Sequence, residues 1–374
     1  MPHAFVAGGG VAATAIGRTL ASNGFTVELG FPGYGVGSTY TNQKWKHSGL
    51  LYPNQRLARK AWDEMQNEAS ELERFIVGSP RPAVFFALNS ETLTQREDWW
   101  REWSVDSWGL PYKRLSVDSV ASLDVIKGSN PAGGFEVPDY VIDFPALIRA
   151  IHSELHGEGH DISSQSTVES VVHDKQTRTV TGVRVRLGDQ RLLKACDLCV
   201  VAAGAWSKQI IEASGFSWPD LILRKCIVLV FEGELVPSIT TCLDIRRYTG
   251  ELKDVTLVPF HGKTLAAGTG FVEIHSMEDL TPDPFELEQL RYELYQAFPT
   301  LAEKPYQVRI CVKTEKRPGG KPNVAPQIRG VETFGVNGLL LTVPGKASFM
   351  FDLARGVLAR EEVQDITNRS TATG

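Results

Sequence analysis

Apolar and polar positions near the start of the chain predict a strand, a helix and a second strand. Residues 5–7 form a short apolar run before three glycines, as a buried strand does. Over residues 11–22 apolar side chains recur at roughly helical spacing, and Asn23-Gly24 ends the helix because glycine readily adopts the left-handed C-terminal conformation. Residues 25–29 predict a second parallel strand. This stretch is therefore expected to form a βαβ unit.

Helical and strand-like segments alternate along the next part of the chain. Residues 54–76 predict one long amphipathic helix, residues 82–89 a strand, and residues 91–109 a second helix with four tryptophans. The tryptophan row indicates helix packing and not a platform for stacked bases, because no basic groove accompanies it. Residues 143–159 predict a capped helix.

The second half of the chain is richer in strands. Residues 166–195 alternate as three short antiparallel strands, and the apolar run after them predicts a buried parallel strand that ends in Ala-Gly-Ala. Residues 221–317 predict several strands and one helix, and residues 338–361 a buried strand, a turn and a helix. The predicted fold class is α/β: a Rossmann-like nucleotide-binding domain with a three-stranded β-meander, interwoven with a second, antiparallel-sheet substrate domain.

The order of these segments predicts two discontinuous domains. We assign residues 1–78, 138–220 and 322–374 to the nucleotide-binding domain, and residues 79–137 and 221–321 to the substrate domain. A chain of 374 residues is longer than a single hydrophobic core usually supports, which agrees with two domains.

Composition narrows the class of protein. The net charge of −5 gives no basic field for nucleic acid, and no apolar run is long enough for a membrane span. No charged leader precedes the apolar start, so we expect no signal peptide and a cytoplasmic monomer or homodimer that acts on a small molecule. An odd number of cysteines in apolar contexts predicts reduced thiols without a metal site, and this includes the C-x-x-C pair on a predicted strand: Cys196, Cys199, Cys226, Cys242 and Cys311.

The glycine-rich turn after the first strand predicts a dinucleotide site. Residues 8–13 read G-x-G-x-x-A, in which Gly8 allows the turn and Gly10 lets the backbone approach a pyrophosphate. Val11 and Ala12 begin the helix whose N-terminus attracts the anion, and Ala13 allows close packing of helix and strand. The position of this motif inside a complete βαβ unit makes it specific.

The acidic partner of the ribose has two alternatives. Glu28 lies 20 residues after Gly8, as the general rule requires. Counted from Gly24, however, the usual position falls on Phe31, and the ribose contact is then missing. We favour Glu28.

Several motifs in a fixed order resemble the D-amino-acid-oxidase-like superfamily of FAD-dependent oxidoreductases. They are "GGGVAATAIG", "GVGST", "NQKWKHSGLLY", "VVAAGAWS", "TLVPFHGKTLAAGTGF" and "TVPGKASFMFDLA". The resemblance extends over the whole chain. It implies a bound FAD, which we expect to be held non-covalently, and an enzyme that transfers hydride from its substrate to the flavin.

The loop "NQKWKHSGLLY" looks most like that of the glycerol-3-phosphate and L-2-hydroxyglutarate dehydrogenase branch. The resemblance places this loop beside the isoalloxazine, with His47 facing the flavin or its substrate. It implies cofactor contacts from this loop and from segments near it or elsewhere in the chain: Ser38, Thr39, Asn42, Lys44, His47, Ser48, Gly49, Leu50, Val168, Ala203, Gly204, Trp206, Gly345, Lys346, Ala347 and Ser348.

The turn before the last predicted helix carries a lysine. The resemblance aims this helix N-terminus at the flavin pyrimidine, where positive charge stabilises the anionic reduced flavin. Lys346 adds a full charge there, although relatives more often have small residues at this position.

Hydride removal also requires a base and a group that holds the substrate. His47 and His261 titrate in the useful range. Arg317 matches an Arg-Pro position that the family uses near the substrate, and a guanidinium suits a carboxylate. Arg246 and Arg247 are alternatives to Arg317, and Tyr248 is a candidate for the wall of the site.

The expected function is therefore FAD-dependent removal of hydride from the α-carbon of a small anionic amino or hydroxy acid. One alternative is an amine oxidase acting on a secondary or cyclic amine. The other is a catalytically decayed flavin-binding protein, which the unusual Phe31 and Lys346 leave open.

Overall fold

The βαβ unit at the start of the chain is formed by β1 (His3–Ala7), α1 (Val11–Ala21) and β2 (Thr26–Phe31). It is seen in a computed structural model that describes residues 1–374 except 53, 79–80, 269, 318–324 and 373–374. Strands β1 and β2 pair in parallel, and the helix between them is buried along most of its length. The predicted elements are confirmed to within two residues at each end.

A six-stranded sheet is built around this unit. Its order is β19-β20-β12-β1-β2-β8, and all pairs are parallel except β19 with β20. The added strands are β8 (Asp161–Ser164), β12 (Leu198–Val201), β19 (Gln327–Arg329) and β20 (Leu339–Val343). Strands β1, β12 and β20 are almost completely buried, which explains their continuous apolar sequences.

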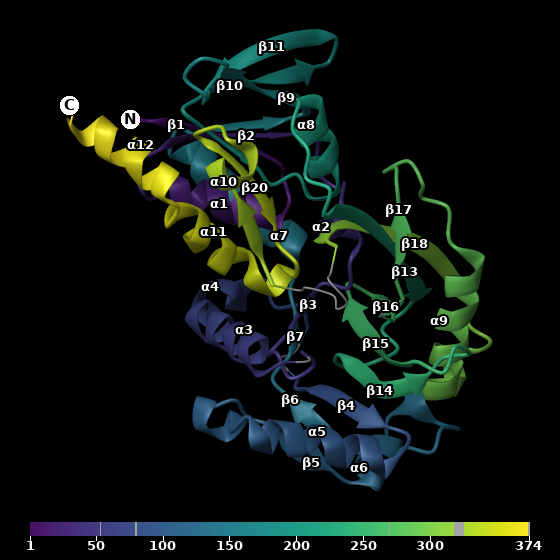
Figure 1. Ribbon diagram of the computed structural model, residues 1–374. Helices are drawn as coiled ribbons and strands as arrows, with labels where there is room; N and C mark the ends of the chain where they lie inside the picture. Colours follow the sequence, from purple (N-terminus) through teal and green to yellow (C-terminus); the bar gives the residue numbers. More distant parts are fainter. Residues whose placement is uncertain (53, 79–80, 269, 318–324, 373–374) are drawn as a thin grey trace.

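Helices pack against this sheet and complete its core. Helix α1 contacts both α7 (Phe144–Gly157) and α11 (Met350–Leu358), and their apolar faces form one cluster with β1, β2 and β12. Three further helices of this domain are α8 (Ser207–Ala213), α10 (Val331–Phe334) and α12 (Glu361–Ala372). Figure 1 shows α11 and α12 side by side at the edge of this domain.

The three-stranded meander is also present. Strands β9 (Ser166–Asp174), β10 (Thr179–Leu187) and β11 (Gln190–Ala195) form an antiparallel sheet of their own, at the top of Figure 1. Helix α8 packs on β9. The predicted fold class, a Rossmann-like domain with a meander and a second sheet domain, is confirmed.

A nine-stranded sheet forms the other part of the molecule. It contains β4 (Ala83–Ala87), β5 (Lys113–Leu115), β6 (Gly133–Val137), β13 (Leu221–Glu232), β14 (Thr240–Arg246), β15 (Leu252–Phe260), β16 (Lys263–Ala267), β17 (Val272–Ile274) and β18 (Tyr306–Lys316). All these strands come from the two segments assigned to the substrate domain. The predicted boundaries next to residues 79, 321 and 322 lie outside the described residues.

Helices and short turns cover this second sheet. They are α5 (Ser90–Glu102), α6 (Val117–Ala121) and α9 (Pro284–Ala297), with 3₁₀ turns at Val105–Trp108, Asp124–Ile126 and Pro299–Leu301. Helix α5 is shorter than predicted, because Ser104 adopts a left-handed conformation and ends it. Trp100 is fully buried against Phe135 and Tyr112, so the tryptophan row serves packing, as predicted.

The segment between the two sheets corrects one prediction. Residues 54–76 are not one helix but α3 (Gln55–Asn67), α4 (Ala69–Leu72) and the 3₁₀ turn Glu73–Phe75. The break falls at Glu68, which leaves helical geometry and accepts a hydrogen bond from the buried ammonium of Lys46 at 3.3 Å. A distant contact thus overrides a continuous helical pattern.

Short strands join this segment to the rest of the molecule. Helix α2 (Ser38–Thr41) precedes β3 (Trp45–Lys46), which pairs with β7 (Tyr140–Val141). Helix α2 also packs on β18 of the large sheet. The loop that contains His47 therefore lies where the two domains meet.

The C-x-x-C pair lies in the core of the first domain. Cys196 and Cys199 are buried with the core of β1, β12 and β20, as packing residues. In the described part of the chain, no helix combines the length and the apolarity needed to cross a membrane.

Candidate functional site

The glycine-rich turn brings two strand ends into close contact. Gly8 has a φ of +140°, and a Cβ placed there would lie 2.5 Å from the carbonyl oxygen of Ala202, just after β12. A Cβ on Gly10 would lie 2.9 Å from Thr39 Oγ1, and this hydroxyl accepts a hydrogen bond from Val11 N at 3.3 Å. The turn therefore requires glycine at position 8, whereas a side chain at position 10 would displace the Thr39 hydroxyl that accepts from Val11 N.

The N-terminus of α1 is open to an anion. Its N-cap is Gly10, which has no side chain, and its first turn has no acidic residue. The amides of Ala12 and Ala13 have no intrahelical acceptor, because the first turn of any helix lacks one. Free amides and a helix dipole at a glycine turn suit a pyrophosphate, so these residues fit FAD.

Glu28 lies away from this anion site. Its carboxylate is buried in the middle of β2, where it pairs with Lys194 at 3.0 Å and accepts a hydrogen bond from Ser163 at 3.2 Å. At the end of β2 lies Phe31, and a Cβ on Gly9 would come within 2.4 Å of its ring. This arrangement favours the second alternative, in which no acid binds the ribose.

Three polar residues that sequence reasoning missed lie beside Phe31. Tyr34 OH is 2.9 Å from His152 Nδ1, and His152 Nε2 is 2.9 Å from Thr14 Oγ1 on the first turn of α1. Burial lowers the pKa of His152 to about 4, so the ring is neutral at physiological pH. No local motif marks this chain of hydrogen bonds, because His152 comes from α7, far along the sequence.

A substitution at Glu28 tests its assignment to the ribose. We expect Glu28→Gln to change the Kd for FAD by less than about twofold, because the carboxylate faces Lys194 and not the turn. Loss of its partly exposed ion pair should lower the free energy of unfolding by about 1 kcal/mol. Isothermal titration of the FAD-free protein with FAD measures the first effect and urea unfolding the second. A tenfold weaker Kd would restore Glu28 as the ribose ligand.

The ring of His47 is enclosed by aromatic side chains. It stacks on Trp45 with ring centroids 3.9 Å apart, and Tyr52 lies 5.6 Å away on the same loop. The backbone amide of His47 donates to Ser348 Oγ at 3.3 Å, which ties this loop to the turn before α11. Burial and the nearby Lys346 lower the pKa of His47 well below its ordinary value, so the imidazole is neutral at pH 7.

A buried carboxylate supports the histidine loop from behind. Asp139 accepts hydrogen bonds from Trp45 Nε1 at 2.7 Å and from Ser48 N at 2.8 Å, and its Oδ2 is 3.9 Å from His47 Nδ1. Burial raises the pKa of Asp139 to about 6. Asp139 was not predicted, because only the pairing of β3 with β7 brings it here.

The remaining residues of the loop hold its shape. Asn42 Oδ1 accepts from Lys44 N at 3.0 Å, and Gly49 is required because a Cβ would lie 2.4 Å from the carbonyl oxygen of Ala58 on α3. Leu50 is buried under Trp100, which donates to its carbonyl oxygen. Gly49 therefore packs on α3, and its carbonyl oxygen accepts a hydrogen bond from Tyr52 N at 2.8 Å.

Lys44 is buried with its ammonium inside the protein. It donates to the carbonyl oxygen of Thr39 and lies 5.8 Å from the ring centroid of Phe260. Burial, and to a smaller extent Arg309, lower its pKa to about 7. Within the described residues Lys44 forms no ion pair with a carboxylate.

The predicted cofactor segments after β12 and before α11 meet near this loop. Gly204 accepts a hydrogen bond from Thr314 Oγ1 of β18 at 3.3 Å, and Trp206 covers Gly37 before α2. Gly345 has a φ of +67°, and Lys346 follows it in the turn. The other predicted contacts in or near these segments are Ala203, Ala347 and Ser348, while Val168 lies on β9 beside the core of the first domain.

One face of β13 and β18 presents cations toward these loops. Arg309, Cys311 and Lys313 alternate along β18 and therefore share a face. Lys313 is the largest cause of the lowered pKa of Lys346, which falls to about 8, so the two ammonium groups lie close together. Arg309 and Lys346 have no ion-pair partner among the described residues, whereas Lys313 pairs with Glu315 at 2.7 Å.

The other side chains that were predicted to contact the substrate, His261 and Arg317, are more exposed than the histidine loop. His261 is 57% exposed, and its Nε2 is 2.7 Å from Asp143 Oδ2, next to the Lys44 region. Arg317 is 56% exposed and its guanidinium pairs with Glu273 on β17, so its charge is already neutralised.

Tyr248 and its neighbours lie on another part of the second domain. Tyr248 is mostly exposed and packs on Tyr292 of α9, and Arg246 is exposed at the end of β14. Arg247 is buried between Glu286 and Glu293, at 2.6 and 2.8 Å. The structure therefore does not bring these three residues to the histidine loop.

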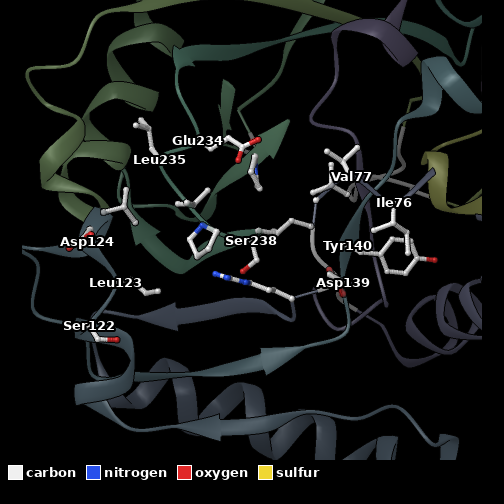
Figure 2. Close-up of a pocket in the computed structure, with 18 residues that line it drawn as sticks. Ile76, Val77, Ser122, Leu123, Asp124, Asp139, Tyr140, Glu234, Leu235 and Ser238 are labelled. Carbon is white, nitrogen blue, oxygen red and sulfur yellow. The ribbon is translucent and has the colours of Figure 1, made fainter. Parts of the chain in front are cut away.

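A cavity of about 600 Å³ lies beside β7, the strand that pairs with β3 of the histidine loop. Figure 2 shows Asp139 and Tyr140 on one side of it, Leu123 and Asp124 on the opposite side, and Ser238 between them. Asp139, Tyr140 and Val141 line this cavity and also contact the histidine loop, Asp139 through Trp45 and Ser48 and the other two through the pairing of β7 with β3. Its lining does not include the predicted catalytic residues His47, His261, Arg317, Tyr248 and Lys346.

Comparison of the sequence with family models gives one assignment. The model described as DAO, FAD dependent oxidoreductase, matches residues 3–343. No curated protein matches the sequence.

Comparison with solved structures shows the same fold over nearly the whole chain. Glycine oxidase from Bacillus cereus ATCC 14579 is 18% identical with a TM-score of 0.69, over 97% of this chain and 98% of that one. L-proline dehydrogenase from P. horikoshii is 16% identical with a TM-score of 0.73, over 99% and 94%. The FAD complex of glycerol-3-phosphate dehydrogenase from Bacillus halodurans is 15% identical with a TM-score of 0.71, over 99% of this chain and 65% of that one.

Proposed function

The chain belongs to the DAO family of FAD-dependent oxidoreductases, and from this premise we propose that it removes hydride from the α-carbon of a small anionic amino or hydroxy acid. The family assignment favours an enzyme over a flavin-binding protein without activity. The glycine turn and the open N-terminus of α1 fit the FAD pyrophosphate. Non-covalent attachment of the flavin stays a prediction.

The observation that carries the proposal is the group of cations where the two domains meet. Lys44, Arg309 and Lys346 form no ion pair among the described residues, and Lys44 is almost completely buried. An uncompensated buried cation is costly, since water no longer solvates it. A carboxylate or phosphate on the substrate would compensate these charges, which supports an anionic substrate and not a neutral amine.

Binding of that anion also prepares the base. The positive charge of Lys346 is one cause of the low pKa of His47. A substrate anion beside Lys346 cancels part of this charge and so raises the affinity of the imidazole for a proton. We propose that His47 then accepts the proton of the substrate hydroxyl or amino group.

The carboxylate of Asp139 stabilises the protonated histidine. Its Oδ2 lies 3.9 Å from His47 Nδ1, and the stacked Trp45 fixes the plane of the ring. Bound FAD would accept the hydride that leaves the α-carbon of the substrate. The protein itself provides the charge that binds the substrate. It also provides the base and the enclosed surroundings of the reaction.

Because we assign the substrate anion to the cation-bearing face of β18, we predict that a substitution there raises KM. Arg309→Met should raise KM by about 10- to 100-fold, because Arg309 on β18 has no ion-pair partner among the described residues and its loss removes one charged hydrogen bond to the anion. Arg317→Met should change KM by less than about threefold, because Glu273 already pairs with Arg317. Steady-state kinetics of both variants with the same substrate give the comparison. The reverse order of effects would return the clamp to Arg317.

Anaerobic bleaching of the FAD-loaded protein tests the function itself. A panel of small amino acids, 2-hydroxy acids and cyclic amines is added in turn, and the flavin absorbance is followed. We expect bleaching by members of the first two groups. Bleaching by secondary or cyclic amines alone would favour the amine oxidase, and bleaching by no member would count against the proposal.

A further inference from the structure

Two cysteines face each other across β13 and β18. Cys226 and Cys311 are direct register partners on these antiparallel strands, so their side chains lie on the same face of the sheet. The Cβ atoms of such partners are about 4.5–5.5 Å apart, and a disulfide needs about 3.8 Å. A closure of roughly an ångström is therefore enough to join them.

Their surroundings distinguish this pair from the other thiols. Helix α2 packs on β18, and the Thr41 hydroxyl at its end contacts Cys311. Cys311 is 3% exposed and Cys226 is half-buried. The strand pair therefore presents both sulfur atoms toward the loops that we assign to the flavin, on the side of β18 where α2 packs.

We propose that Cys226 and Cys311 form a reversible disulfide when the protein meets hydrogen peroxide. Cys311 is the attacking thiol and Cys226 resolves the product. The pair is thus an oxidative modification site inside the enzyme, and it does not depend on the identity of the substrate.

The charges of the site support this division of roles. The thiol of Cys226 donates toward the sulfur of Cys311, and this contact, with Lys313 and Lys44 nearby, lowers the pKa of Cys311 to about 6. The same contact and burial raise the pKa of Cys226 well above its usual value. Burial also raises the pKa of Cys196, Cys199 and Cys242. Cys311 alone among the five cysteines therefore has substantial thiolate character at pH 7.

The reaction balances with peroxide as the only oxidant. The Cys311 thiolate attacks one oxygen of hydrogen peroxide, the O–O bond breaks, and after proton transfer a sulfenic acid and one water are formed. The Cys226 sulfur then attacks the sulfenic sulfur, its proton leaves with the hydroxyl group as a second water, and the S–S bond forms. Two thiols lose two electrons, and one peroxide gains them. Dithiothreitol reverses the change.

The chain offers a matched control thiol. Cys242 is fully buried on β14 of the same sheet, but its register partners are Val255 and Phe86. Cys226 and Cys242 share the tryptic peptide 226–246, whereas Cys311 lies in peptide 310–313. The Cys242→Ser variant is therefore the background in which a cross-link is assigned without ambiguity.

The experiment treats this FAD-loaded variant with a few equivalents of hydrogen peroxide at pH 7. We expect the loss of two titratable thiols, a mass decrease of about 2 Da, a cross-link between peptides 226–246 and 310–313, and full reversal by dithiothreitol. With Cys226→Ala added, dimedone should instead label Cys311 as the sulfenic acid. An unchanged thiol count, a cross-link to another cysteine, or oxidation to sulfinic acid without a cross-link would overturn the proposal. The readouts need no turnover, so they separate this inference from the proposed function.

Discussion

His47→Ala is expected to slow reduction of the flavin by about 10²- to 10³-fold, within the range that loss of a general base produces. The FAD content should stay near that of the wild type, because the described polar contact from His47 to the turn before α11 comes from its backbone amide. The Trp45 ring and the Asp139 hydrogen bonds to Trp45 and Ser48 remain to hold the loop. Anaerobic stopped-flow absorbance gives the rate, and the flavin spectrum of the purified protein gives the content.

A second histidine serves as the control for this prediction. His261 is exposed and bound to Asp143, so His261→Ala should change the rate by less than about threefold if His47 is the base. A larger loss in His261→Ala would move the base to that residue. Equal losses of rate and FAD content in His47→Ala would show that the residue positions the cofactor.

The pH dependence gives the same prediction an independent readout. Burial raises the pKa of Asp139 to about 6, so its carboxyl is charged above that pH and neutral below it. Protonation removes the charge that stabilises protonated His47, and the wild-type rate should fall as the pH drops through about 6. His47 itself stays neutral in this range, because its pKa lies well below its ordinary value. The residual rate of His47→Ala should not show this step.

Local patterns predicted the parts of the fold that depend on local sequence. The βαβ unit, the meander and the buried strand before Ala-Gly-Ala follow from periodicity and from glycine at turns. The prediction of one long helix over residues 54–76 is wrong at Glu68, because a contact with Lys46 from another element determines the conformation there. The hydrophobic periodicity of a segment gives no information about a partner from another element.

The candidate site likewise contains some residues that the sequence could identify and others that it could not. The glycine turn and the histidine loop are contiguous in sequence, and both could be found there. Asp139 and His152 have no local signal, because strand pairing and helix packing bring them to the site. Arg309 and Lys313 alternate along β18, so the sequence does indicate a cationic strand face, whereas the family resemblance points to Arg317.

Gly8→Ala is expected to have the largest effect on stability and on cofactor binding. A side chain at a φ of +140° costs about 1–3 kcal/mol, and its Cβ would also overlap the carbonyl oxygen of Ala202 at 2.5 Å. That carbonyl belongs to backbone just after a buried central strand and has little room to move. We expect a total loss of about 3–5 kcal/mol in the free energy of unfolding, in the upper range for single substitutions. Displacement of the turn should also reduce the FAD content to less than about a tenth, because it moves the N-terminus of α1.

Gly33→Ala separates strain from close packing in this prediction. Gly33 has a φ of +143°, almost the same as Gly8, but a Cβ there would meet no atom within 4 Å. It should therefore lose only the strain of about 1–3 kcal/mol and keep its FAD. Urea unfolding must be measured without FAD, since bound FAD stabilises the folded state by mass action and would add its own loss to Gly8→Ala. Equal stability of the two FAD-free variants would show that the ends of β1 and β12 do not need this glycine to approach each other.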